Sequence, residues 1–341
     1  MVSKLVETPK ESKSARPIEL LMSYGVLLIG ILLFVYFSAR QPMFYTSSNI
    51  LTILRQASVI GLISLAMMTT VIIGDFDISV TVNANFCAIV IILLIMNNVN
   101  LYLALLIGML CSILVSFFNC FAVVTIGLPS FVATIAVKFF LEGVCRGLTG
   151  GQQVYPDVFP DGFHTFGRGM IADVIPVQVV IFLVSTAILA YLIQYTRHGR
   201  YITALGESPE TSFHVGINIK KIRFIAYLIS GILIGLAGII TASMYSVASV
   251  GTTDGYATPI LIATFLGASF LRGDQLPLPN PKGTALSAVI LAILANGFTM
   301  LGVPFYSKQI IQGGVLVFTV IAVSILMNRR RAIEATTNSK A

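Results

Sequence analysis

The stretch IRFIAYLISGILIGLAGIITAS, residues 222–243, decides the fold class of this chain. It holds a single charged side chain, Arg223, near its start. A helix rises about 1.5 Å per residue, so a stretch of about 20 residues crosses a bilayer hydrocarbon core of about 30 Å. Gly231, Gly235 and Gly238 lie about one turn apart, which is typical of helices that pack closely in lipid. We predict a transmembrane helix here.

The rest of the chain repeats this pattern. Of 341 residues, 56% are hydrophobic and only 10% are charged, whereas soluble domains carry about 25% charged residues. The segment 257–271 is short and flanked by Gly and Pro, which favours a broken or re-entrant segment. We therefore predict an all-α polytopic membrane protein with about ten transmembrane helices, at residues 20–39, 50–73, 78–96, 101–125, 131–148, 176–195, 222–243, 257–271, 284–301 and 309–327.

The distribution of basic residues predicts the orientation, because Lys and Arg accumulate in cytoplasmic loops. If the N-terminus is inside, only Arg40, Arg168 and Lys308 fall outside. Both termini are then cytoplasmic, and the net charge of +7 needs no nucleic acid as a partner. The inside set comprises Lys4, Lys10, Lys13, Arg16, Arg197, Arg200, Lys220, Lys221, Arg223, Arg272, Lys282, Arg329, Arg330, Arg331 and Lys340.

The predicted organisation is one membrane domain with short tails, in the bacterial inner membrane. Residues 1–19 form a cytoplasmic tail, residues 20–327 the membrane domain, and residues 328–341 a second cytoplasmic tail. The first apolar stretch is longer than a signal-peptide core and has no A-x-A cleavage site after it, so we expect a retained helix. Within the domain, residues 149–175 form a periplasmic loop and residues 196–221 a cytoplasmic loop.

Signatures of catalysis are missing from the sequence. There is no G-x-x-x-x-G-K-[ST], H-E-x-x-H or G-x-S-x-G motif. The three histidines are scattered over loops, and the four cysteines lie in apolar runs without metal-ligand or disulfide spacing. We predict a protein that is not an enzyme and binds no metal or cofactor, so that any energy from ATP must enter through a partner subunit.

The cytoplasmic loop carries the signals of a short helix. Ser208 can be its N-cap and Pro209 its first residue, Glu210 suits the positive helix start, and Gly216 can close the end in a left-handed conformation. Phe213 and the neighbouring Val215 are available to insert into a cleft on another protein. The alternative is a solvated loop with one helical turn, and spacing alone does not separate the two.

Several ordered motifs resemble the ribose-type sugar permeases of ABC importers. In the cytoplasmic loop and the following helix they are GRY at 199–201, ALG at 204–206, GINIKKI at 216–222, SG at 230–231 and LAGII at 236–240. Elsewhere, residues 74–80 are similar to G-x-D-L-S-V-G, LPSFVAT at 128–134 to L-P-x-F-I-A-T, and NG at 296–297 with LGV at 301–303 to N-G-x-x-x-L-G-V. The likeness covers about residues 45–327.

The resemblance implies a type II importer permease-like bundle that translocates a ribose-like monosaccharide or a similar small polar solute. It implies two ATPase subunits that bind ATP and Mg²⁺, a periplasmic or lipid-anchored substrate-binding protein, and a second permease that is either identical or homologous. The cytoplasmic loop would then be the ATPase-coupling loop, with Gly206, Glu207, Ser208, Pro209, Glu210, Phe213 and Gly216 as its candidate residues.

The chain departs from the family pattern at four places. Thr81 replaces a glycine, residues 257–259 read ATP where acidic residues are common, and Thr211 and Ser212 stand where alanines are frequent. Residues 273–281, GDQLPLPNP, replace a glycine-rich turn. These departures bear on the substrate and the matching ATPase more than on the architecture.

Polar residues within the apolar stretches are candidates for a substrate pathway, because such groups are costly in lipid and tend to face the bundle interior or water. Amides supply both donors and acceptors for sugar hydroxyls. Interhelical hydrogen bonding or helix capping is an equal alternative for each residue. The candidates are Asp77, Ser79, Asn83, Asn85, Asn119 and Asn296.

Lys138, Glu142 and Arg146 follow one another at spacing i, i+4, which places them on one helix face. Mutual neutralisation of opposite charges is the interpretation we prefer. The alternative is a proton relay, in which case this face or Asp77 would be the coupling group of an ion- or proton-coupled secondary transporter.

Overall fold

The chain folds as a helical bundle, as expected where backbone groups must be satisfied within each segment in lipid. The computed structural model describes residues 16–269 and 278–338. Most of the predicted N-terminal tail, Arg272, most of the 273–281 turn and residues 339–341 lie outside this range. The helices are α1 (Arg16–Arg40), α2 (Ser47–Ile72), α3 (Val80–Met96), α4 (Leu101–Cys120), α5 (Ser130–Thr149), α6 (Thr165–Arg168), α7 (Val177–Tyr195), α8 (Arg197–Glu207), α9 (Pro209–His214), α10 (Ile219–Tyr245), α11 (Ala257–Leu266), α12 (Pro281–Met300) and α13 (Phe305–Asn338).

Short elements connect these helices. Two strands, β1 (Met170–Ile171) and β2 (Ile175–Pro176), pair antiparallel in the connection before α7. A π-helical turn at Phe121–Ile126 extends α4, and Gly127 ends it with a φ of 84°. The 3₁₀ turns are η1 (Pro42–Tyr45), η3 (Asp254–Tyr256) and η4 (Gly267–Ser269).

Each of the ten predicted stretches overlaps a helix, but not all of these helices pass a test of length and apolar composition for crossing a membrane. Within the described residues six helices pass it: α2, α4 with its π turn, α7, α10, α12 and the part of α13 up to Ile325. The apolar part of α1 and helix α3 are shorter, and α5 carries three charged side chains. The chain is therefore a multi-pass membrane protein, while the count of ten crossings stays a prediction.

Helix α11 corresponds to the short predicted stretch at residues 257–271. It holds 10 residues, about 15 Å of helix, which is half of a hydrocarbon core. It packs against α12, α2 and α13. The expectation of a short, interrupted segment at this place therefore agrees with the structure.

Helix α10 forms the centre of the bundle, packed against α2, α3 and α4. Its glycines make the close contacts predicted from their spacing: a Cβ at Gly231 would lie 3.0 Å from Cα of Ile113, and one at Gly238 would lie 2.9 Å from the carbonyl oxygen of Ala84. The Ser112 hydroxyl of α4 also donates to the Gly231 carbonyl at 3.0 Å. Small residues and hydroxyl bridges thus replace the hydrophobic effect that lipid cannot supply.

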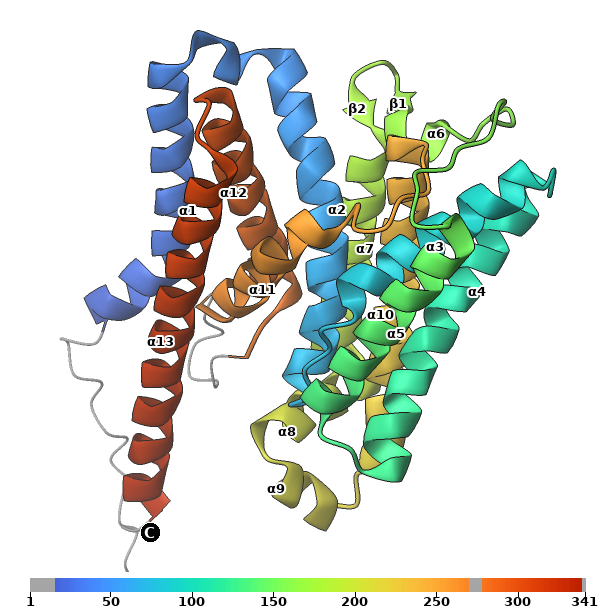
Figure 1. Cartoon of the computed structure of the whole chain (residues 1–341). Helices are drawn as coiled ribbons and strands as arrows, with labels where there is room; N and C mark the ends of the chain where they lie inside the picture. The colour runs from blue at the N-terminus through green and yellow to red at the C-terminus, as the bar shows by residue number, and fades with distance from the viewer. Residues whose placement is uncertain (1–15, 270–277, 339–341) are drawn as a thin grey trace, which may run out of the picture.

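The two ends of the bundle carry different connections (Figure 1). Helices α8 and α9 project from one end, toward which α13 also runs, while the β1–β2 hairpin and α6 lie at the opposite end. The basic-residue pattern predicted that loops 196–221 and 149–175 lie at opposite ends of the bundle, and this arrangement agrees with it. The predicted C-terminal tail is helical through Asn338.

The connection between α5 and α7 packs down onto the end of α10. Phe163 is fully buried there, its carbonyl accepts from the Ser243 hydroxyl, and that hydroxyl also accepts from the Gly167 amide at 2.8 Å. Arg168 donates to the Met244 carbonyl at 3.0 Å. The predicted periplasmic loop is therefore an ordered cover on the end of the central helix.

Candidate functional site

Helix α9 has the caps that its sequence predicted. The Ser208 hydroxyl accepts from the Thr211 amide at 3.2 Å, Pro209 is the first helical residue, and Glu210 lies in the first turn. Gly216 follows the helix with a φ of 80°, a conformation that glycine adopts without strain. These short-range contacts fix the helix as a rigid projection.

The outer side of α9 presents apolar side chains to its surroundings. Phe213 is 68% exposed and Val215 is 69% exposed. Exposed aromatic groups on a rigid projection are typical anchors for a partner protein. The structure thus shows a capped helix of six residues here, while its docking to a partner stays a prediction.

Helix α8 attaches this projection to the membrane helices through two glycines. A Cβ at Gly199 would overlap the Leu192 carbonyl oxygen of α7, and a Cβ at Gly206 would overlap the Ile72 carbonyl oxygen at the end of α2. Ile202 and Leu205 are buried between these contacts. The glycines of the GRY and ALG motifs therefore allow α8 to lie directly on the ends of two spanning helices.

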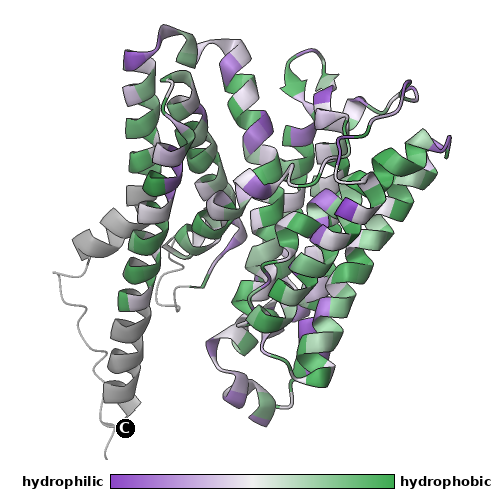
Figure 2. Cartoon of the chain, viewed as in Figure 1, coloured by the Kyte–Doolittle hydropathy of each residue, from purple (hydrophilic) through white to green (hydrophobic). Residues whose placement is uncertain are grey.

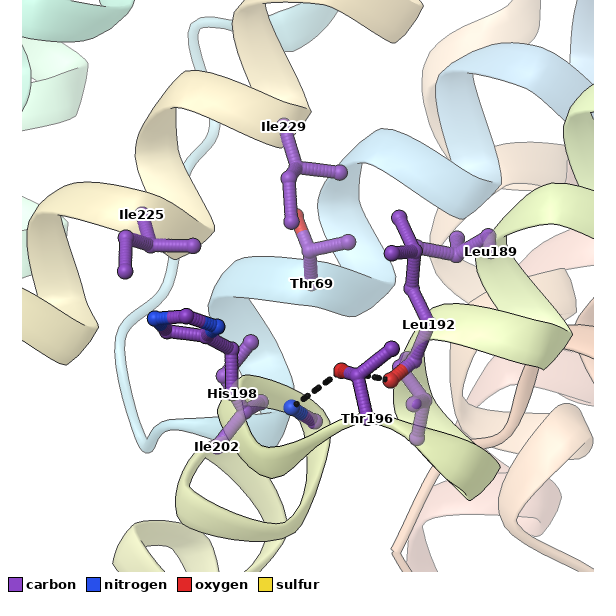
Figure 3. Close-up of a pocket in the computed structure, with 10 residues that line it drawn as sticks. Thr69, Leu189, Leu192, Thr196, His198, Ile202, Ile225 and Ile229 are labelled. Carbon is purple, nitrogen blue, oxygen red and sulfur yellow. Dashed lines mark hydrogen bonds between the residues drawn. The ribbon is translucent and has the colours of Figure 1, made fainter.

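A cavity of about 170 Å³ lies where α8 meets α2, α7 and α10 (Figure 3). Its walls are mostly aliphatic, and Thr69 and His198 also line it. Thr196, another lining residue, donates to the Leu192 carbonyl and accepts from the Gly199 amide. The threonine hydroxyl thus caps α8 by accepting from Gly199 and donates back to the end of α7. The cavity thus offers no free polar group from Thr196 for a ligand.

Residues 73–79 connect α2 to α3 without regular structure and lie between the contact of α8 with α2 and an ion pair with α10. Gly206 touches Ile72 immediately before this segment. Three residues later, Asp75 lies 3.6 Å from the Arg223 guanidinium in the first turn of α10. Burial raises the pKa of the Asp75 carboxyl, which lies beyond the end of α2, to about 6, and the positive charge of Arg223 opposes that rise.

The same segment is joined to α5 and α11 by polar and aromatic contacts. Thr134 of α5 donates to the Phe76 carbonyl at 3.0 Å and accepts from the Ile78 amide at 3.2 Å. Ser130 accepts from the Phe76 amide at 3.0 Å. The Phe76 ring stacks on Phe265 of α11, with centroids 6.0 Å apart.

Three of the predicted pathway residues form one buried cluster at the end of this segment. The Ser79 hydroxyl and amide both donate to Asp77, and Asn119 of α4 donates to Ser79 at 2.8 Å and to Asp77 at 3.4 Å. All three side chains are 0% exposed. In this conformation they hold the 73–79 segment against α4, which favours the hydrogen-bonding alternative, while pathway lining stays a prediction.

The structure separates the other three candidates. Asn83 donates to the Ser112 carbonyl of α4 at 3.1 Å, and Asn85 donates to the Ser249 carbonyl at 3.0 Å. Asn296 of α12 is buried, and its side-chain oxygen has no hydrogen-bond partner among the described residues. The six candidates therefore do not converge on one cavity.

The charged face of α5 is only partly neutralised. Lys138 and Glu142 form an ion pair at 3.6 Å, with side chains 31% and 26% exposed. Arg146 is exposed and has no ion pair within the described part of the chain. The preferred interpretation from sequence is thus correct for the first two residues and leaves Arg146 unexplained.

Two functional features were missed in the sequence. Helix α8 could have been predicted, because Thr196 suits an N-cap and Ile202 and Leu205 follow at helical spacing. The Asp75–Arg223 pair carries no local signal, since about 150 residues separate its members. Among the described residues, no group of three or more His, Cys, Asp or Glu side chains could hold a metal ion.

Comparisons with known proteins agree with the family resemblance. A family model described as branched-chain amino acid transport system / permease component matches residues 49–320. A probable ABC transporter permease of Escherichia coli K12 is 27% identical, over 90% of each chain. The ribose import permease of the same strain is 29% identical over 88% of this chain and 93% of its own, and an L-arabinose permease of Azospirillum brasilense is 24% identical over 93% and 91%.

Proposed function

The chain belongs to the family of branched-chain amino acid transport system permease components, and from this premise we propose that it is the permease subunit of an ATP-driven sugar importer. The cargo class is a monosaccharide or a similar small polar solute. Relatives at 24% to 29% identity that are named for ribose and arabinose import support this class. The site of action is the bacterial inner membrane, with both termini on the cytoplasmic side.

The observation that carries the proposal is the capped and exposed α9, mounted on α8. Its cap is complete, its apolar side chains have no cover within the described chain, and α8 rests on the ends of α2 and α7. Such a projection suits a cleft on an ATPase subunit. ATP and Mg²⁺ would be bound by that partner, and a substrate-binding protein would deliver cargo at the opposite end.

The contacts of residues 73–79 indicate how a movement of the projection reaches the spanning helices. Gly206 of α8 contacts Ile72, directly before this segment, and Arg223 of α10 pairs with Asp75 within it. The segment in turn is bound to α5 through Ser130 and Thr134. A displacement of α8 therefore has to displace residues 73–79 or break these contacts. We propose that closure of the ATPase subunits moves α5 through this route.

The test uses membrane vesicles that contain this chain, its ATPase and its binding protein. We expect sugar uptake that requires ATP hydrolysis, and no uptake by vesicles that contain the chain alone. Uptake by the chain alone under a proton or sodium gradient would contradict the proposal and would support a secondary transporter.

The docking role of α9 has its own control. Glu210→Ala and Phe213→Ala should weaken ATPase binding or uncouple hydrolysis from uptake while the permease stays folded. Val174→Ala at the opposite end removes an apolar side chain of similar exposure, 65%, and should change neither. If ATP hydrolysis and sugar uptake stay normally coupled in both α9 variants, the docking role is contradicted.

A further inference from the structure

Charged side chains at the exposed surface of a membrane helix need an explanation. Lipid does not tolerate them, so such residues face a partner or water. On α5, Glu142 is partly exposed and Arg146 is exposed, whereas Val137 and Leu141 are buried against α3. Figure 2 shows hydrophilic positions among the largely hydrophobic turns of α3 and α5. The charged side chains of α5 thus lie beside, and not within, the apolar contact that Val137 and Leu141 make with α3.

A small polar pocket lies at this face. Asn85 of α3, Glu142 and Arg146 of α5, and Gly251 and Asp254 of the turn before α11 line it. Its enclosed volume of about 20 Å³ holds one water molecule. Arg146 and Asp254, which line it, are exposed, so a larger ligand would have to bind them from that exposed side. Asn85 lies 11 residues before the end of α3 at Met96, about 16 Å along the helix, which places the pocket well inside the bundle.

The turn that supplies Asp254 is shaped to present its carboxylate. Gly251 has a φ of 84° and accepts from the Asp254 amide at 3.1 Å. The carboxylate folds back over Gly251, where an added Cβ would lie 2.9 Å from Oδ2. Thr253 fixes the turn to α3, since its hydroxyl donates to the Thr81 carbonyl at 2.9 Å.

The groups in this pocket retain free hydrogen-bonding capacity. Neither Arg146 nor Asp254 has a side-chain hydrogen bond or ion pair within the described residues, and Asn85 uses its amide nitrogen on Ser249. Carboxylates accept from hydroxyls, and guanidinium groups donate to them. Glu142 and Asp254 carry two negative charges, and Arg146 and the neighbouring Lys138 carry two positive charges. The local charge therefore balances, which suits a neutral ligand.

We propose that Asn85, Glu142, Arg146 and Asp254 form a binding site for a neutral polyhydroxylated cargo on its way through the bundle. This inference rests on the proposed function and deepens it. Vicinal hydroxyls of a monosaccharide match adjacent carboxylates and a guanidinium. The pocket differs from the buried Asp77 cluster because two of its charged side chains, Arg146 and Asp254, are exposed and have no side-chain partner within the described residues.

Transport stoichiometry tests the site in vesicles with the ATPase and the binding protein, using D-ribose, L-arabinose and D-xylose as labelled cargo. Arg146→Gln and Asp254→Asn should each lower the sugar delivered per ATP hydrolysed about tenfold. Stimulation of hydrolysis by the loaded binding protein should stay within about twofold of wild type. Arg40→Gln and Asp157→Asn are the matched controls, since both side chains are exposed outside the pocket, and should deliver sugar normally.

The outcomes separate this site from the proposed function. If the wild-type complex delivers sugar and both pocket variants deliver as much per ATP, the site is overturned while the importer stands. If the wild-type complex delivers none of the three sugars, the sugar-import proposal is contradicted.

A labelling experiment tests sugar binding at the pocket without measuring transport. Val250→Cys places a thiol in the wall of the pocket and leaves its polar groups intact. In the assembled complex, millimolar D-ribose, L-arabinose or D-xylose should slow its reaction with a membrane-impermeant thiol reagent at least threefold. Val158→Cys, in the exposed connection before α6, should react at the same rate with and without sugar. Equal rates at Val250→Cys with every sugar would contradict the site.

Discussion

The α8–α9 end of the bundle and the α5 polar pocket are built in opposite ways. At the α8–α9 end, the serine cap, the two glycine contacts and the Asp75–Arg223 pair bind neighbouring elements to one another. At the α5 polar pocket, Arg146 and Asp254 have no side-chain partner within the described chain. The difference indicates that the α8–α9 end is built to keep its shape. The pocket instead keeps polar groups available to bind a ligand or partner outside the chain.

This contrast predicts different responses to substitution. Changes at the buried contacts of the α8–α9 end should first affect the stability of the fold, because they leave buried groups crowded or unpaired. Changes at the pocket should leave stability almost unaltered and should affect the delivery of cargo. Melting temperature in detergent and sugar delivered per ATP separate these two responses.

Gly206→Ala is expected to have the largest effect on stability. The added methyl group would overlap the Ile72 carbonyl oxygen, and a backbone atom cannot move aside as a flexible side chain can. Overpacking of this kind costs about 3 kcal/mol, and thermal unfolding of the purified permease measures it. Gly313→Ala in α13, where no atom lies within 4 Å of the added Cβ, is the control. An unchanged melting temperature for Gly206→Ala would show that α8 does not rest on α2.

Arg223→Gln should have the next largest effect. It leaves Asp75, whose side chain is 5% exposed, without its neutralising charge, although Arg223 itself is 28% exposed. Removing one partner of a buried pair is strongly destabilising, and partial exposure of Arg223 reduces the expected cost to about 2 kcal/mol. Thermal unfolding again provides the measurement.

A double-mutant cycle gives the control for this pair. Asp75→Asn combined with Arg223→Gln removes both charges, so the double variant should be more stable than the sum of the single losses predicts. The same variants should lower uptake per ATP, because the contact between α10 and residues 73–79 is weakened. Additive losses with normal coupling would show that this pair does not transmit movement from the ATPase subunits to the spanning helices.

Asn119→Ala should have a smaller effect. It removes the donor to Ser79 and Asp77, and an unsatisfied buried polar group costs about 1–2 kcal/mol. If the residue serves only to hold residues 73–79 against α4, the folded fraction should deliver sugar per ATP as wild type does. A selective loss of delivery with normal melting would instead place Asn119 in the cargo pathway and weaken the contrast between the two regions.

The sequence alone predicts the features that depend on local patterns. Apolar stretches located the helices, the short α11 included, and the residues around Ser208 predicted the caps of α9. The spacing of Gly231, Gly235 and Gly238 predicted close packing of the central helix. Each of these signals lies within one helix or one turn, where residue type and spacing determine the geometry.

Features that join distant segments were not predictable in the same way. The pairing of Asp75 with Arg223 depends on how α2, α5 and α10 pack. So does the position of Arg146 and Asp254 in the lining of one pocket. The sequence marked Asp77, Asn119 and Asn85 as polar residues in apolar stretches. It could not show that the first two bind each other in the core while Asn85 reaches a separate, more open pocket.

Phe213→Ala should have the smallest effect on stability and tests whether exposure at the projection has a different meaning from exposure at the pocket. The side chain is 68% exposed, so its loss should change the free energy of unfolding by no more than about 0.5 kcal/mol. A central aromatic anchor nevertheless dominates binding, so co-purification of the ATPase should fall at least tenfold, whereas Asp254→Asn should leave it intact. Equal ATPase binding by both variants would mean that α9 is not the anchor, and the contrast between a docking end and a cargo site would have to be abandoned.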